Sequence, residues 1–124
     1  MIGYVNLGTN NIDEASAFYD ALLAEMGAKR ILDLGTFIVW AASPSQPALS
    51  ISLPEDGSPA SVGNGTMVAL KANSNEQVNE LYEKAISLGA TDEGKPGPRP
   101  PEGFYAAYFR DLDGNKLNFY HMTS

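Results

Sequence analysis

The side chains that could do chemistry in this sequence are mostly oxygen donors, because its 124 residues include no cysteine and a single histidine, His121. Thiol nucleophiles, disulfides and iron–sulfur clusters all need cysteine, and a catalytic zinc, nickel or iron site usually takes two or three imidazoles. One histidine near the chain terminus also gives no basis for a Ser-His-Asp triad. Any transition-metal site would therefore be built almost wholly from carboxylates.

Charge and hydropathy exclude several kinds of partner. Eight basic residues are scattered over a chain of formal net charge −7. Nucleic acids and anionic membranes are bound by clustered Lys and Arg, so neither is expected, whereas a net negative charge mildly attracts cationic ligands. Residues 37–42 form the longest apolar run, far short of the ~20 residues that span a bilayer, and residues 1–4 lack a signal-peptide pattern. We expect a cytoplasmic protein.

An internal repeat shows which elements must position the polar side chains. Residues 4–19 align without gaps on residues 67–82. Each copy starts as an alternating strand and continues as an amphipathic helix, which is capped by Asn11 or Ser74 with Glu or Gln three residues later. Two helices of matching length and phase predict two copies of one supersecondary unit.

Strand patterns complete each copy to a βαβββ module. The expected strands are residues 2–8, 29–34, 37–42 and 49–53 in the first half, and 66–71, a weak one near 90–92, 105–110 and 116–121 in the second. Residues 111–115 predict a tight reversal, and residues 54–65, rich in Gly, Pro and Ser, predict a connector. Residues 1–124 are thus one domain, with modules at about 1–55 and 64–124.

Neither module could bury both its helix and its sheet alone. We predict an α+β fold in which the two sheets form one curved eight-stranded mixed sheet, a cup, with the helices on its convex side. Strand alternation then selects the residues of the concave side, whose half-polar, half-aromatic character is typical of a small-molecule site. These predicted cup residues are Tyr4, Asn6, Ser50, Met67, Asn118 and Tyr120.

Four further residues are candidates for the walls of this cup. Residues 94–103 hold too many prolines for a strand or a helix, and we predict a loop over the cup mouth in which Arg99 reaches an anionic ligand group. Tyr105 or Tyr108 would add aromatic surface, and Trp40 would form a stacking wall. The alternatives are a solvated crossover loop and, for Trp40, a place in the core or a dimer interface.

In this order and spacing, the motifs resemble the glyoxalase, bleomycin-resistance and extradiol dioxygenase proteins, the vicinal-oxygen-chelate (VOC) superfamily. The resemblance covers nearly the whole chain. It rests on the paired modules, on Val5-x-Leu7-Gly8 leading into Ala17-Phe18-Tyr19, and on Asp111-Leu112-Asp113-Gly114-Asn115, which has leucine where the family usually has proline. It also implies a homodimer, in which the modules pair within one chain or exchange between chains.

Members of this family that use a metal bind it with His or Glu on four strands. The resemblance places those positions at Tyr4, Ser50, Met67 and Asn118, and none of these is a good ligand for zinc, nickel or iron. His121 is three residues from Asn118 and falls on the opposite face of a regular strand. We therefore expect neither a metal nor another cofactor.

Three functions remain open. The first is binding of a small aromatic or amphipathic molecule in the cup without the family's metal. The second is a lyase, isomerase or dioxygenase-type enzyme of the same superfamily, with a non-standard metal or with Tyr4 or Tyr120 as acid or base. The third is a scaffold whose cup is filled by its own side chains and whose function lies at a dimer interface.

Overall fold

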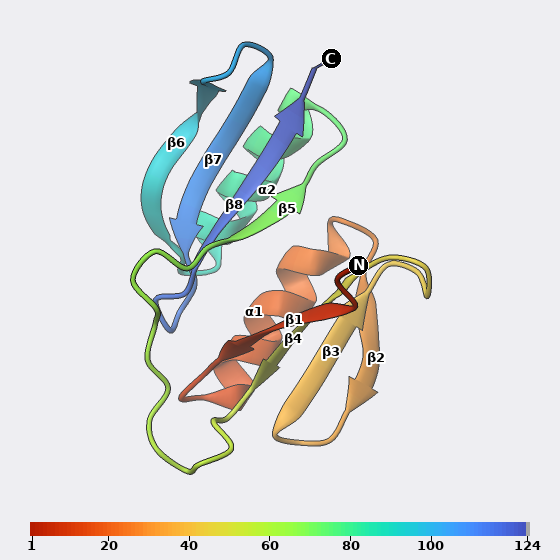
Figure 1. Cartoon of the computed structure of the whole chain (residues 1–124), viewed down its shortest axis with the longest axis vertical. Coiled ribbons are helices and arrows are strands. Elements are labelled where there is room, and N and C mark those ends of the chain that lie inside the picture. Colours follow the sequence, from red (N-terminus) through yellow and green to blue (C-terminus); the bar gives the residue numbers. More distant parts are fainter. Residues whose placement is uncertain (124) are drawn as a thin grey trace. The chain divides into compact units, whose positions relative to one another are not determined.

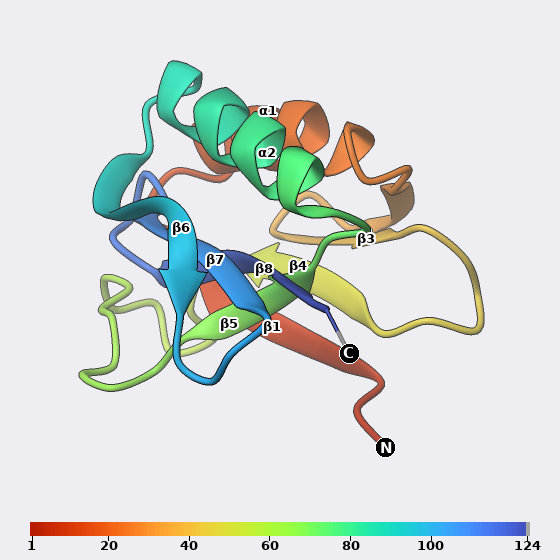
Figure 2. The same cartoon turned by 90° about the horizontal axis from the view of Figure 1, so that it is seen from above.

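A computed structural model describes residues 1–123 (Figure 1). Contacts along the chain divide it into two compact units, Met1–Gly63 and Asn64–Ser124, which we call the N-terminal and C-terminal modules. Each module is a βαβββ unit in which one helix covers one face of a four-stranded sheet (Figure 2). No helix within residues 1–123 combines the length and the apolar character that crossing a membrane requires.

The N-terminal module has its sheet in the order β1-β4-β3-β2. Strand β1 runs parallel to β4, and the other neighbours are antiparallel, so the sheet is mixed. Its elements are β1 (Tyr4–Gly8), α1 (Ile12–Ala24), β2 (Lys29–Asp33), β3 (Phe37–Ala41) and β4 (Ala48–Ser52).

The C-terminal module repeats this topology in the order β5-β8-β7-β6, again with its first and last strands parallel. The predicted α+β class and the two βαβββ modules are confirmed, and strand pairing gives one four-stranded sheet in each module. The elements are β5 (Val68–Lys71), α2 (Asn75–Ser87), β6 (Thr91–Arg99), β7 (Phe104–Arg110) and β8 (Lys116–Met122).

Both helices begin at the caps that the sequence predicts. The Asn11 side chain accepts a hydrogen bond from the Glu14 backbone N–H at 3.0 Å, and the Ser74 hydroxyl accepts one from Gln77 at the same distance. The Gln77 side chain in turn accepts from the Asn73 backbone N–H at 2.6 Å. These bonds satisfy N–H groups that the first turn of a helix otherwise leaves unpaired.

Strand alternation determines which side chains pack against each helix. Complete burial of one such apolar side chain contributes roughly 1.5–3 kcal/mol. The buried helix-facing strand residues are Leu7, Ile38, Trp40, Leu49 and Ile51 in the N-terminal module, and Ala107, Phe109, Leu117 and Phe119 in the C-terminal module. The alternate residues of the same strands lie on the opposite face, which we call the cup face of each module.

The prediction of a loop at residues 94–103 is wrong over most of its length. Strand β6 runs for nine residues through Pro96 and Pro98. It is an edge strand that pairs only with β7, and its register shifts between Asp92 and Gly94 and again between Gly94 and Gly97. Proline is tolerated at an edge because one side of the strand needs no N–H donors, and such irregularities absorb residues that cannot pair.

Candidate ligand-binding surface

The polar side chains on the cup face of the N-terminal module form hydrogen bonds with one another. Ser50 on β4 is completely buried, and its hydroxyl donates to Asn6 Oδ1 on β1 at 2.8 Å. The Asn6 amide donates in turn to the Ser52 hydroxyl at 3.0 Å. Two predicted cup residues, Asn6 and Ser50, are therefore together, but their polar atoms are engaged with each other and with Ser52.

An aromatic contact crosses the same face. The rings of Tyr4 on β1 and Phe37 on β3 meet edge to face, with their centroids 6.2 Å apart. Because β4 lies between β1 and β3, this contact spans the strand that carries Ser50. Tyr4 remains 58% exposed, so its ring can still contact another molecule.

The cup face of the C-terminal module contains a polar atom without a partner. Asn118, in the middle of β8, is only 2% exposed. Its Oδ1 is the single buried side-chain nitrogen or oxygen within residues 1–123 that has no hydrogen-bond partner. Leaving a buried acceptor unpaired costs about 1–3 kcal/mol, and native proteins contain few such groups. This oxygen is the strongest sign of a ligand contact in the described chain.

Aromatic side chains surround Asn118. Tyr108 on β7 is its direct register partner, and Tyr120 lies two residues further along β8 on the same face. The Tyr120 ring stacks on Phe104, with centroids 5.6 Å apart and planes 24° from parallel. All three rings are half-buried, so they combine a fixed position with accessible surface.

Two cations lie against the Tyr108 ring. Arg99 Cζ and Lys116 Nζ are each 5.7 Å from its centroid. Arg99 is held along its own strand because Nη2 donates to the Lys95 carbonyl at 2.7 Å. A Cβ atom on Gly94 would lie 3.2 Å from the Tyr108 ring and 3.4 Å from Arg99 Nη2. The glycine in β6 therefore leaves space for the guanidinium beside the ring.

Two of the predicted wall residues lie on the helix side. Trp40 is 1% exposed, and its Nε1–H donates to Asp20 Oδ1 on α1 at 2.8 Å. The Tyr105 hydroxyl donates to Asn79 Oδ1 on α2 at 2.7 Å. Both side chains are thus used in packing a helix onto a sheet, and they lie on the face opposite the cup residues of their own modules. Of the predicted wall residues, Arg99 and Tyr108 remain on a cup face.

Met67 and His121 lie at the borders of the C-terminal sheet. Met67 comes just before β5 and is 42% exposed. The His121 ring, on β8, lies with Nδ1 3.0 Å from Asn75 Oδ1, at the start of α2. His121 therefore faces the helix, as its spacing from Asn118 predicts.

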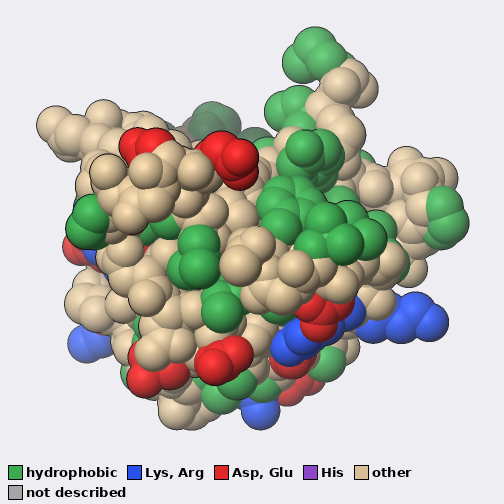
Figure 3. All heavy atoms as spheres, turned by 90° about the horizontal axis from the view of Figure 1, so that it is seen from below, with side chains coloured by type: hydrophobic (Ala, Val, Ile, Leu, Met, Phe, Trp, Pro, Cys, Tyr) green, Lys and Arg blue, Asp and Glu red, His purple; other side chains and the backbone are tan. Residues whose placement is uncertain are grey.

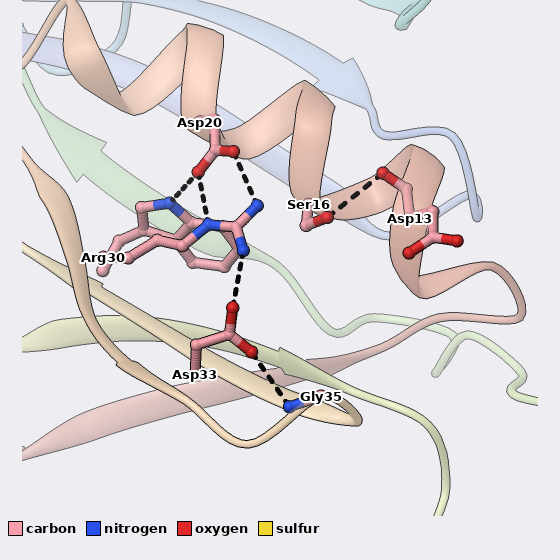
Figure 4. A network of polar contacts seen from close by, with 7 residues as sticks. Asp13, Ser16, Asp20, Arg30, Asp33 and Gly35 are labelled. Atoms are coloured by element: carbon pink, nitrogen blue, oxygen red, sulfur yellow. Dashed lines mark hydrogen bonds and ion pairs between the residues drawn. The ribbon is translucent and has the colours of Figure 1, made fainter.

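Sequence reasoning missed a charged cluster between α1 and β2 (Figure 4). Asp20 points from the helix toward Arg30, which it binds through two hydrogen bonds of 2.8 and 2.7 Å, and Asp33 binds the same guanidinium at 2.9 Å. Bonding to Arg30 holds the pKa of the Asp20 carboxyl below its usual range, and these carboxylates raise the Arg30 pKa. A hollow of about 300 Å³ adjoins the cluster on the helix side of the sheet. Since Asp20 and Asp33 are both occupied by Arg30, the cluster acts as a clamp between α1 and the β2–β3 hairpin.

Apolar side chains also reach the surface, as the green areas among charged side chains in Figure 3 show. In the N-terminal module, the β2 edge exposes Ile31 at 58% and Leu34 just beyond it at 67%. Exposed apolar side chains at an edge strand are compatible with a protein contact. The homodimer stays a prediction.

The two mixed sheets, each with a helix on one face and a polar and aromatic cup face on the other, define a protein of the VOC fold. The model of the Glyoxalase/Bleomycin resistance protein/Dioxygenase superfamily matches residues 1–119. The chain belongs to this superfamily. No curated protein matches the sequence.

Solved structures share this fold over nearly their whole length. A glyoxalase/bleomycin resistance protein from Albidiferax ferrireducens is 34% identical, with a TM-score of 0.90 and 99% of each chain covered. A lactoylglutathione lyase from Agrobacterium tumefaciens is 22% identical, with a TM-score of 0.70 over 98% of this chain and 92% of that one. A fosfomycin resistance protein from Listeria monocytogenes is 18% identical, with a TM-score of 0.75 over 99% and 93%. At these lower identities the last two show the fold alone.

At the four positions that the family resemblance assigns to a metal, the donor atoms do not fit one. Tyr4 offers a phenol, Ser50 a hydroxyl that already donates to Asn6, Met67 a thioether and Asn118 a neutral amide oxygen. Zinc, nickel and iron sites are built from imidazole, thiolate and carboxylate groups. Within residues 1–123, no three His, Asp or Glu side chains gather in an arrangement that could hold an ion.

Proposed function

We propose that this protein binds a small aromatic or amphipathic molecule on the cup face of its C-terminal module, without the superfamily's metal. The observation that carries the proposal is the buried, unpartnered Asn118 Oδ1 with aromatic rings beside it. A ligand N–H or O–H group that donates to this oxygen would remove the cost of leaving it unpaired.

The surrounding rings favour a flat ligand. Offset or edge-to-face contact with an aromatic ring contributes about 0.5–1.5 kcal/mol beyond the area it buries. Tyr108 presents such a surface beside Asn118 on β7, and the stacked Phe104–Tyr120 pair presents another further along β8. The ligand we expect therefore has an aromatic body and at least one hydrogen-bond donor, a combination typical of small-molecule sites.

Titration calorimetry with naphthol and methoxynaphthalene tests this proposal, because the two differ in one O–H donor on the same ring system. We expect naphthol to bind more tightly than methoxynaphthalene, by on the order of tenfold for one hydrogen bond to a buried acceptor. Asn118→Val should remove this preference. The matched control is Asn64→Val, which changes an exposed asparagine in the connector.

Two results would contradict the proposal. One is the absence of binding by both compounds, and the other is an unchanged naphthol preference in Asn118→Val. The metal-free part is tested by elemental analysis of protein purified without chelators. A one-to-one content of nickel, zinc, manganese or iron would contradict it and favour the lyase, isomerase or dioxygenase alternative.

A further inference from the structure

Arg99 and Lys116 have no carboxylate partner among the described residues, and both lie at one aromatic ring of the C-terminal cup face. Within residues 1–123, ion pairs join only Arg30 and Arg110 to carboxylates: Arg30 to Asp20 and Asp33, and Arg110 to Glu93. The Arg99 guanidinium donates to the backbone carbonyls of Pro98 and Lys95, and Lys116 Nζ lies over the Tyr108 ring. Both cations nevertheless lie against the same ring, that of Tyr108.

From this arrangement we infer that the ligand of the C-terminal cup face is an anion, an aromatic oxyacid whose charged group is held by Arg99 and Lys116. The inference rests on the binding function proposed above and adds the charge of the ligand. It reverses the expectation from net charge, because two cations lie at the Tyr108 ring although the formal charge of the whole chain is −7.

The position of the two cations fits one ligand that also reaches Asn118. Tyr108 is the register partner of Asn118, so the ring that carries both cations adjoins the unpaired amide oxygen. The anionic group of the ligand would accept hydrogen bonds from Arg99 and Lys116, and a hydroxyl or amino group of the same ligand would donate to Asn118 Oδ1. An aromatic hydroxy acid or amino acid carries both groups.

Arg99 keeps the donors that such a group requires. A guanidinium has five N–H groups in a planar fork, and the structure uses two of the Arg99 nitrogens for single bonds to Lys95 and Pro98. The remaining N–H groups can bind a carboxylate or phosphate, and charge-assisted bonds of this kind are roughly twice as strong as neutral ones. A Cβ atom at position 97 would lie 3.1 Å from Arg99 Nη1, so Gly97, like Gly94, leaves space for the guanidinium, which the bonds to Lys95 and Pro98 orient.

The test compares hydroxynaphthoate with its neutral counterpart hydroxynaphthamide by titration calorimetry. We expect the acid to bind at least tenfold more tightly, an advantage that falls from about 0.1 M to about 1 M salt as screening increases. Arg99→Gln and Lys116→Gln should each lower the affinity for the acid by on the order of tenfold and leave the amide within a factor of about three. Lys84→Gln, on α2, is the control for loss of one positive charge.

A further variant and two competing anions test the role of the guanidinium and the kind of charged group that it binds. Arg99→Lys preserves the charge without the fork, so it should retain part of the preference for the acid, and thermal unfolding checks that each variant is folded. Competition by benzoate and by inorganic phosphate distinguishes a carboxylate from a phosphate ligand. Equal affinity for acid and amide, both dependent on Asn118, would overturn the anion inference and leave the proposed function standing. Failure of acid, amide and naphthol alike would overturn the proposed function itself.

Discussion

Replacing Asn118 by valine should make the protein more stable. Asn118 Oδ1 is buried without a partner, so the native state carries its desolvation cost of about 1–3 kcal/mol. Valine removes that oxygen, is close in size and suits a strand better than asparagine. We therefore expect the free energy of unfolding to rise by about 1–2 kcal/mol, or about 4–8 °C in Tm for a chain of this length.

Ser50→Ala is the matched control, because Ser50 is the equally buried polar residue of the other module. Its hydroxyl is satisfied by Asn6 at 2.8 Å, so its removal should lower the free energy of unfolding by about 1 kcal/mol. The two substitutions are thus expected to act in opposite directions, although each removes a polar group from a cup face.

Urea unfolding followed by circular dichroism and by tryptophan fluorescence measures both variants. Agreement between the two probes would show that the modules unfold together, which the comparison of free energies requires. If Asn118→Val lowers stability by more than 1 kcal/mol, then Oδ1 has a favourable partner in the native protein. The reasoning that assigns a ligand contact to Asn118 would then be refuted.

Two predictions concern contacts between helix and sheet. Asp20→Ala leaves the buried Trp40 Nε1–H unpaired and should cost about 1–3 kcal/mol in urea unfolding, whereas Asp20→Asn keeps an acceptor and should cost less. The pKa of Asp20 in the native state lies below its usual range, so its charge stabilises the fold at any pH above the pKa of the unfolded chain. This stability is lost as the pH falls through the native pKa. Asp20→Asn should therefore make the free energy of unfolding depend less on pH in acid. Burial and the bond to Asp92 raise the pKa of Tyr82 to about 12, against 10.0 in the unfolded chain. The protonated Tyr82 hydroxyl therefore contributes its full stability below pH 10.0 and loses it toward pH 12. Tyr82→Phe should make Tm depend less on pH in this alkaline range, and thermal unfolding at a series of pH values measures this.

The parts of the fold that could be predicted from sequence depend on local chemistry. Asn11 and Ser74 cap their helices because a short polar side chain can reach N–H groups three residues ahead in any context. The reversal at residues 111–115 closes through Asp111 Oδ1, which accepts from the backbone N–H groups of Asp113 and Asn115, each at 2.9 Å. Alternation along β8 likewise separates Asn118 from the helix-facing Leu117.

Predictions failed where the answer depends on a partner distant in sequence. Prolines argue against a strand, yet Pro96 and Pro98 lie in one because β6 is the sheet edge, and edge position is a property of the assembled sheet. Trp40 and Tyr105 looked like wall residues because an aromatic side chain suits a cup or a core equally well. Their hydrogen bonds to α1 and α2 show that both side chains lie on the helix side of their sheets, and these bonds form only when the helices pack on the sheets.

By itself, the sequence determined that the chain is a pair of βαβββ modules, because the repeat and the hydrophobic period can be read along the chain. The family resemblance adds the prediction that the metal-binding positions hold poor ligands. Only the tertiary structure decided that Asn118 Oδ1 is buried without a partner and that Arg99 and Lys116 each lie against the Tyr108 ring. These facts follow from the register of β6, β7 and β8, which brings three separate segments together. Whether a buried polar atom finds a hydrogen-bond partner depends on the residues of the neighbouring strands, and the sequence of one strand does not specify them.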